Sequence, residues 1–204
     1  MKKTFISAIS LQAARNLKRF TYHPDGFELK NNRETSFPIV PIIAEHMGKQ
    51  KADVCVIAIL PEGNDAAENF ETFKNELREM GLTDENVIGL SLEGKSNGRN
   101  GIELLLQILD AIPNDTLIYS DITYNTKPMS AMVLCAMNLV EKVKDSEVVG
   151  IYYGEIPRID GKAVPEKAAL CDITQFKSVL DITNYMEQLE IKDIRSALGY
   201  LLLP

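Results

Sequence analysis

The sequence predicts an α/β protein: a Rossmann-like, doubly wound and mostly parallel sheet with β-hairpin insertions. Apolar runs of strand length alternate about five times with segments of helical periodicity. Residues 53–60, reading DVCVIAIL, form a continuous apolar run, which is typical of a strand covered by helices on both faces. No low-complexity or linker-like stretch divides the chain, so we expect one domain over residues 1–204.

The expected strands are short apolar runs that end at polar or turn-forming residues. They are residues 4–9, 53–60, 87–92, 117–119, 148–153 and 168–173. Two further stretches predict hairpins, because Pro and Gly favour tight turns. These are the Pro24-Asp25-Gly26 turn within residues 22–27, and residues 157–166.

The expected helices lie between these strands. Residues 39–47 follow Pro38, residues 66–80 end at Gly81, and residues 102–112 end at Pro113. Residues 93–101 are rich in Gly and Asn and are expected to be a loop. Pro128 opens the fourth helix, and residues 176–189 form the last. The tripeptide Asp-Ile-Thr occurs at 121–123, 172–174 and 181–183, which we attribute to chance and to helix capping.

Composition excludes several classes of protein. The net charge of −7 argues against a surface that coats duplex nucleic acid. No apolar run approaches the length of a membrane span, so we expect no membrane partner. Cys55, Cys135 and Cys171 lack metal-type spacing, and we expect three reduced core thiols in a cytoplasmic protein.

The most informative stretch is residues 116–137, in which a buried strand, a polar loop and a helix N-terminus follow one another. Such loops form the ligand crevice of an open α/β sheet, and the first amides of a helix favour anions. Lys127 adds a full positive charge, so the loop suits a phosphate. Other side chains that could contact a nucleotide are Thr123, Tyr124, Asn125, Thr126 and Ser130.

Asp121 directly follows the strand. A carboxylate would repel a phosphate, so we expect Asp121 to hold the loop by accepting backbone N–H hydrogen bonds.

The loop after the first strand reaches the same crevice in this fold class, and it carries Ser7, Ser10, Gln12 and Arg15. It has neither the G-x-G-x-x-G fingerprint nor a P-loop, which disfavours a nicotinamide cofactor. Lys95 lies in a second basic, glycine-containing loop. His23 and His46 have no partners at ligand spacing, so we expect no metal and no other cofactor.

Several motifs in order resemble the CARF domain (CRISPR-associated Rossmann fold), in the branch whose members often carry a HEPN ribonuclease. The resemblance covers nearly the whole chain, including the hairpin-like stretch 22–37 and Ala44-Glu45-His46. Its motifs are residues 5–10 (FISAIS), Asp121-Ile122-Thr123, Thr126-Lys127-Pro128-Met129, residues 149–154 (VGIYYG), and Asp172-Ile173-Thr174 followed by Phe176. The chain departs from the branch at Tyr124-Asn125, where His-Gly is frequent, and at Lys127, which replaces Arg.

The resemblance implies a homodimer that binds a cyclic oligoadenylate across its two-fold axis, as the sensor of type III CRISPR antiviral signalling. We expect cyclic tetra-adenylate to be favoured over cyclic hexa-adenylate. The expected ligand-binding residues are Ser7, Ser10, Leu11, Gln12, Lys95, Thr123, Tyr124, Asn125, Thr126, Lys127, Met129, Gly154 and Glu155.

Two other functions stay open. The protein could be a metal-independent ring nuclease, in which a ribose 2′-OH attacks the adjacent phosphorus, Lys127 stabilises the developing charge and Ser10 orients the phosphate. It could also be a Rossmann-like nucleotide-binding protein outside CRISPR. Arg195 has no His behind it, so we expect no HEPN nuclease here. The effector would be separate or C-terminal to this chain, and residues 191–204 would be a linker stub or a dimer contact.

Overall fold

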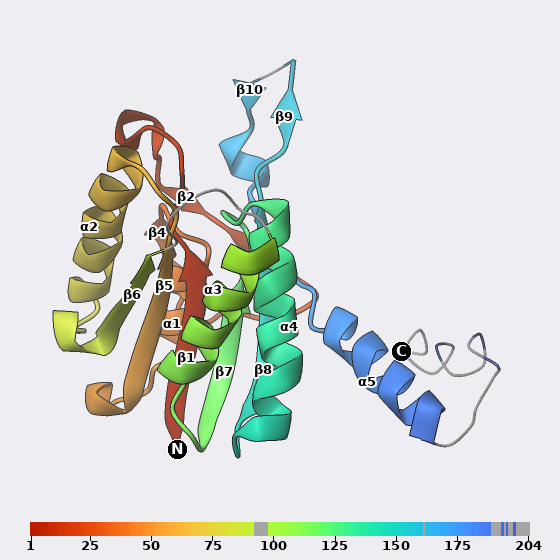
Figure 1. Ribbon diagram of the computed structural model, residues 1–204. Helices are drawn as coiled ribbons and strands as arrows, with labels where there is room; N and C mark the ends of the chain where they lie inside the picture. The colour runs from red at the N-terminus through yellow and green to blue at the C-terminus, as the bar shows by residue number, and fades with distance from the viewer. Residues whose placement is uncertain (92–97, 161, 189–192, 194, 196–197, 199–204) are drawn as a thin grey trace.

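A computed structural model describes residues 1–204 except 92–97, 161, 189–192, 194, 196–197 and 199–204. Its centre is a seven-stranded sheet of order β3-β11-β8-β7-β1-β5-β6 (Figure 1). The five strands from β8 to β6 are parallel, β11 runs antiparallel to β8, and β3 runs parallel to β11. The predicted doubly wound, mostly parallel α/β fold is therefore confirmed. In chain order the strands are β1 (Lys2–Ala8), β3 (His23–Asp25), β5 (Val54–Leu60), β6 (Val87–Ser91), β7 (Thr116–Asp121), β8 (Glu147–Glu155) and β11 (Ala169–Asp172).

Helices cover both faces of the sheet (Figure 1). One apolar core packs α1 and α2 against the face that carries Phe5 and Val56. A second core packs α3 and α4 against the face that carries Ile6 and Ile57. Adjacent residues of β1 thus point to opposite cores, which is why its sequence is apolar at consecutive positions. The helices are α1 (Ile39–His46), α2 (Asn64–Arg78), α3 (Gly98–Ala111), α4 (Lys127–Val143) and α5 (Gln175–Gln188).

Helix α5 extends away from the sheet, beside α4 (Figure 1). It is fixed to α4 by an ion pair of 2.7 Å between Lys177 Nζ and Glu141 Oε2. Among the helices in the described part of the chain, none combines the length and the apolar character that crossing a membrane requires.

Two small antiparallel pairs accompany the central sheet. β2 (Phe20–Thr21) pairs with β4 (Glu34–Thr35), and β9 (Arg158–Ile159) pairs with β10 (Lys162–Ala163). The second pair is the hairpin expected at 157–166. The hairpin expected around Pro24 is not formed, because His23–Asp25 joins the edge of the central sheet beside β11 instead.

Other differences concern single elements. Helix α3 begins at Gly98, within the stretch expected to be a loop, so Gly and Asn residues here begin a helix. Cys135 is exposed on α4, and Cys55 and Cys171 are only partly buried. The expectation of three core thiols was therefore wrong for Cys135, which lies on the solvent side of an amphipathic helix. Most of residues 191–204 lies outside the described part.

Candidate functional site

The strand order reverses between β1 and β7, which lie side by side in the centre of the sheet. After β1 the chain passes to α1 on one face, and after β7 it passes to α4 on the other face. Their carboxyl ends coincide, since Ser7 pairs with Asp121. Two loops that leave in opposite directions from adjacent strand ends open a crevice, and ligands of open α/β sheets bind at this point.

Asp121 lies at the floor of the crevice and is completely buried. Its Oδ2 accepts a hydrogen bond of 2.8 Å from the Ser7 hydroxyl, and its Oδ1 accepts from the Thr123 N–H at 3.0 Å and from the Thr123 hydroxyl. Burial raises the pKa of Asp121 to about 6, although the hydrogen bonds from Thr123 and Ser7 oppose this rise. This is the geometry of a carboxylate that anchors a loop.

Thr123 joins the loop to the neighbouring strand. Its hydroxyl oxygen accepts a hydrogen bond of 2.6 Å from the Gly154 N–H on β8. A Cβ at Gly154 would lie 2.5 Å from Cγ of Pro38 and 3.1 Å from Oγ1 of Thr123. Glycine is therefore required at position 154 by the close approach of two other segments.

The loop after β1 is held from below by α2. Asn69 is buried, and its Nδ2 donates to the carbonyl oxygens of Ser10 and Gln12, each at 2.8 Å. The Ser10 hydroxyl accepts a hydrogen bond of 3.2 Å from the Gln12 N–H. Ser7 and Ser10 are both buried, so in this structure their hydroxyls shape the crevice and do not face it. Leu11 is exposed.

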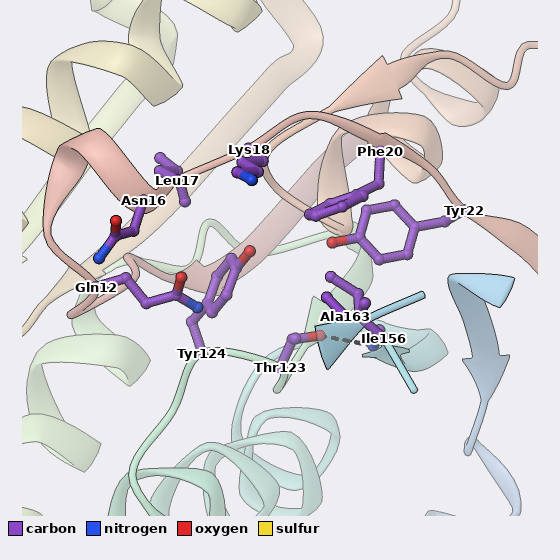
Figure 2. Close-up of a pocket in the computed structure, with 11 residues that line it drawn as sticks. Gln12, Asn16, Leu17, Lys18, Phe20, Tyr22, Thr123, Tyr124, Ile156 and Ala163 are labelled. Atoms are coloured by element: carbon purple, nitrogen blue, oxygen red, sulfur yellow. Dashed lines mark hydrogen bonds between the residues drawn. The ribbon is translucent and has the colours of Figure 1, made fainter. Parts of the chain in front are cut away.

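A cavity of about 490 Å³ lies between the two loops (Figure 2). This volume is within the range of about 300–1,000 Å³ that small-molecule sites occupy. Four lining residues were predicted from the sequence, namely Gln12, Thr123, Tyr124 and Gly154. Seven were not, and they are Asn16, Leu17, Lys18, Phe20, Tyr22, Ile156 and Ala163.

The missed residues come from two segments that fold over the crevice. One follows the first loop and includes β2, and the other is the β9–β10 hairpin and the chain that leads into it. The basic residues of 11–20 and the aromatic pair Phe20 and Tyr22 were visible signals. Sequence patterns could not place them over the crevice, because the pairing of β2 (Phe20–Thr21) with β4 (Glu34–Thr35) follows no local pattern.

Tyr124 forms one wall of the cavity. Its hydroxyl donates a hydrogen bond of 2.8 Å to the Ser36 carbonyl, and its ring packs edge-on against Phe37. Burial raises the pKa of Tyr124 to about 12. Ser36 is held in turn by Glu76, a buried carboxylate of α2 that accepts the Ser36 N–H at 3.0 Å. The wall is thus anchored to the core.

The N-terminus of α4 lies beside the cavity but does not line it. Lys127 is exposed, whereas Met129 is buried in the core beneath α4. The side-chain polar atoms of Asn125 and the Thr126 hydroxyl are buried without a hydrogen-bond partner in the described part of the chain. Among the described residues, the cation that lines the cavity is Lys18, and Lys127 is not in the lining. Glu155 is exposed outside the cavity, and Lys95 lies outside the described residues.

The histidines lie away from the cavity lining. His46 stacks on Tyr119 at 4.5 Å between ring centroids, and burial lowers its pKa. His23 is in the edge strand β3. Within the described residues, no group of three or more His, Cys, Asp or Glu side chains is arranged to hold a metal ion.

No family model matches the sequence, and no curated protein matches it.

Proposed function

We propose that this protein binds a cyclic oligoadenylate at the crevice between β1 and β7, as a homodimeric sensor of type III CRISPR signalling. The observation that carries the proposal is the cavity at the point of strand-order reversal, lined by aromatic, amide and cationic side chains. The resemblance of 121–123, 126–129 and 149–154 to CARF motifs supports the same ligand, because all three segments meet at this edge of the sheet.

The phosphates of the ring would lie along the N-terminus of α4. Lys127 is exposed there, and the first amides of a helix carry partial positive charge. Pro128 follows immediately and has no N–H to offer. The Lys127 ammonium group and the remaining N–H groups of the first turn of α4 would therefore both bind the phosphate.

A symmetric dimer would bring two such helix N-termini to one ring. This arrangement concentrates positive charge locally in a chain whose net charge is −7. Cyclic tetra-adenylate is the preferred ring, with cyclic hexa-adenylate as the larger alternative.

The test is to titrate the full chain with cyclic tetra-adenylate and cyclic hexa-adenylate, and to follow binding by calorimetry and products by chromatography. We expect Lys127→Ala to weaken binding by roughly 10- to 100-fold, because a charge-assisted hydrogen bond contributes about 1.5–3 kcal/mol. Lys142→Ala removes the same charge from the last turn of the same helix, and should bind like the wild type. Failure to bind either ring would refute the proposal, and a strictly monomeric protein would refute the dimer.

The same titration separates the sensor from a ring nuclease. A sensor leaves the ring intact, whereas a ring nuclease yields linear products with a 2′,3′-cyclic phosphate that disappear in Lys127→Ala. Ser10 has its hydroxyl buried and bonded to the Gln12 N–H, so a catalytic role for Ser10 requires that loop to move. We therefore expect binding without cleavage.

A further inference from the structure

We propose that residues 11–21 form a lid over the cavity, and that the ion pairs of Arg19 with Glu76 and Glu79 of α2 form the latch that holds this lid closed. The proposal goes beyond the proposed function, because it concerns the closure of the cavity and does not depend on which ligand the cavity takes. The lid supplies five of the eleven lining residues, which are Gln12, Asn16, Leu17, Lys18 and Phe20 (Figure 2). With the lid displaced, the cavity would lose one of its sides.

The lid has two fixed ends and no buried residue between them. Ser10 and Tyr22, which flank it, are both completely buried. Asn69 Nδ2 donates to the Ser10 carbonyl at 2.8 Å, and Asn32 Nδ2 donates to the Tyr22 carbonyl at 2.7 Å. Every residue from 11 to 21 is exposed or only partly buried. Segments with few buried contacts open at a lower free energy than the core, so Ser10 and Tyr22 would be the hinges of a local opening.

Helix α2 holds the lid at two points. Asn69 and Glu76 are both buried and lie seven residues apart, so they share one face of α2. Asn69 Nδ2 also donates to the Gln12 carbonyl at 2.8 Å, near the start of the lid. Glu76 holds the other end, where its Oε1 lies 3.3 Å from Arg19 Nε. The first attachment is a hydrogen bond between uncharged groups, whereas the second depends on charge.

The outer part of the latch is exposed to solvent. Arg19 Nη2 binds Glu79 Oε1 at 2.9 Å, and Arg33 Nη2 binds Glu79 Oε2 at 3.0 Å. The hydrogen bond from Arg19 lowers the pKa of Glu79, which keeps this carboxylate charged at neutral pH. The side chains of Arg19 and Glu79 are 41% and 44% exposed. Ion pairs of this kind are weak and are screened by salt, so the latch would release without disruption of the core.

The inner part of the latch tolerates that release. Besides its ion pair with Arg19, the buried Glu76 carboxylate accepts the Ser36 N–H at 3.0 Å and the Thr35 hydroxyl. If Arg19 moved away, these two donors would remain, and the opening would admit water, so Glu76 would not become an unpaired buried charge. The Ser36 carbonyl accepts the Tyr124 hydroxyl at 2.8 Å. The cavity wall at Tyr124 would therefore keep its anchor while the lid is open.

The first test is digestion of the folded full chain by trypsin, which cleaves after Lys and Arg. The lid contains three such sites, at Arg15, Lys18 and Arg19, and cleavage there follows the population of the locally open state. Glu79→Gln removes the charge that binds Arg19 and Arg33 but keeps every trypsin site. We expect cleavage in the lid to become roughly 2- to 20-fold faster, because each exposed ion pair shifts an equilibrium by roughly 1.5- to 5-fold.

Glu71→Gln is the matched control. It removes the same charge from the same helix, but the ion pair that it breaks, of 2.6 Å with Lys74, lies within α2. Lid cleavage in Glu71→Gln should equal that of the wild type, and cleavage after Lys74 should stay slow in both variants. Raising the salt from about 0.05 M to about 0.5 M should accelerate lid cleavage in the wild type and in Glu71→Gln, but much less in Glu79→Gln. Cleavage of a short peptide by the same trypsin corrects for the effect of salt on the protease.

A second measurement reports on the cavity itself. Ile156 lines the cavity and belongs to the chain that leads into β9. Ile156→Cys places a thiol there, in a Cys135→Ser background because Cys135 is exposed. The rate of labelling by a thiol reagent, compared with that of the Cys135→Ser parent, measures access to the lining. We expect Glu79→Gln to accelerate this labelling by the same factor as lid cleavage, and Glu71→Gln to leave it unchanged.

The outcomes decide each part of the proposal. Faster lid cleavage and faster labelling in Glu79→Gln, with slow cleavage after Lys74, would support a latched lid. Lid cleavage at the wild-type rate in Glu79→Gln would overturn the latch, and faster cleavage with unchanged labelling would overturn the lid. Faster cleavage after Lys74 as well would show that α2 itself had loosened, which contradicts a local opening. No measurement uses an oligoadenylate, so these results are independent of the sensor proposal.

Discussion

Two Asp-Ile-Thr turns, 121–123 and 172–174, close on the same strand by the same contacts, but of the two only the first lines the cavity described above. In each, the Asp Oδ1 accepts hydrogen bonds from the Thr N–H and hydroxyl two residues later. In each, the Thr hydroxyl accepts an N–H of β8, from Gly154 in the first turn and from Ile151 in the second. The Ile N–H donates to a β8 carbonyl in both. The tripeptide is thus a device for fastening a strand end to β8.

The difference lies in the surroundings. Asp121 is completely buried and also accepts the Ser7 hydroxyl, whereas Asp172 is exposed. The first turn is followed by the loop 124–126 before α4 begins, but the second leads directly into α5 at Gln175. The tripeptide therefore fastens the strand, and the loop that follows the first copy supplies Tyr124 to the lining of the cavity.

The third copy shows that the tripeptide alone does not specify the turn. Residues 181–183 lie within α5, where Thr183 Oγ1 donates to the Val179 carbonyl at 2.8 Å and Asp181 pairs with Lys177. The interpretation of the tripeptide as helix capping was wrong for 121–123, because the N-cap of α4 is Thr126. Thr174 does stand directly before α5, although its hydroxyl binds the Ile151 N–H of β8. What selects the turn is its position at the end of a strand that has β8 as a neighbour.

The largest expected difference between the turns is a pH effect at Asp121. Its pKa is raised from 3.8 to about 6, so between these values the folded protein holds a proton that the unfolded chain has lost. The contribution of Asp121 to the free energy of unfolding must then fall as pH rises from about 4 to about 6, by at most about 3 kcal/mol. Above about pH 6 this contribution stays constant. Asp121→Asn does not titrate, so urea unfolding of wild type and variant at several pH values should reveal this loss in their difference. A difference that is flat or rises with pH would contradict the assignment.

The next effect is expected at the β8 residue whose N–H binds the Thr hydroxyl of each turn. We call this contact between turn and strand a clamp. Gly154→Ala places a methyl group 2.5 Å from Pro38, so we expect a loss of about 1–3 kcal/mol from overpacking. The second clamp uses Ile151, whose side chain packs in the core. Ile151→Val therefore serves as a control with an expected cost of about 0.5–1.5 kcal/mol. Thermal and urea unfolding measure the stability of both variants. A Gly154→Ala variant as stable as the wild type would show that Pro38 can shift at little cost in free energy.

Substitution of the two clamp threonines, Thr123 and Thr174, should lower the stability of the protein by similar amounts but affect ligand binding differently. Thr123→Val and Thr174→Val each leave a buried β8 N–H without its acceptor, at a cost of about 1–3 kcal/mol. Only Thr123 lines the cavity, so only Thr123→Val should also weaken nucleotide binding. Calorimetric titration of both variants at a temperature where both are folded decides this. Equal loss of binding would mean that the cavity depends on β8 as a whole.

The smallest effect is expected at Tyr124, in the loop that only the first turn possesses. Tyr124→Phe removes the hydrogen bond to the Ser36 carbonyl but keeps the ring beside Phe37. We expect a loss of about 1 kcal/mol in unfolding experiments and nearly unchanged binding of the proposed nucleotide ligand. Tyr124→Ala should instead remove an aromatic ring from the cavity lining, so binding of the proposed nucleotide ligand distinguishes the two variants. If Tyr124→Phe alone abolished binding, the hydroxyl and not the ring would be the part that matters.

Most of the fold could be predicted because its signals are local. The apolar runs of β1, β5 and β7 and the breaks at Pro61, Gly81 and Pro113 set the strands and helices nearly as they are found. The edge strand β3 could not be predicted, because three residues around Pro24 carry no strand pattern and pair with β11 about 146 positions later. Seven of the eleven lining residues were missed for a similar reason, since no local pattern brings Phe20 and Tyr22 together with Ala163 over the crevice.

The central position of β1 has a consequence for how the chain is made. Its partner β7 lies more than a hundred positions downstream, as the hydrogen bond between Thr4 and Thr116 shows. At ribosomal speeds of about 5–20 residues per second, the first strand waits roughly 5 to 20 seconds for that partner to be synthesised. The cavity waits longer, because it also needs Ile156 and Ala163. A nascent chain can therefore build its first helices and strands early, but the lining of the cavity is complete only after residue 163 has been synthesised.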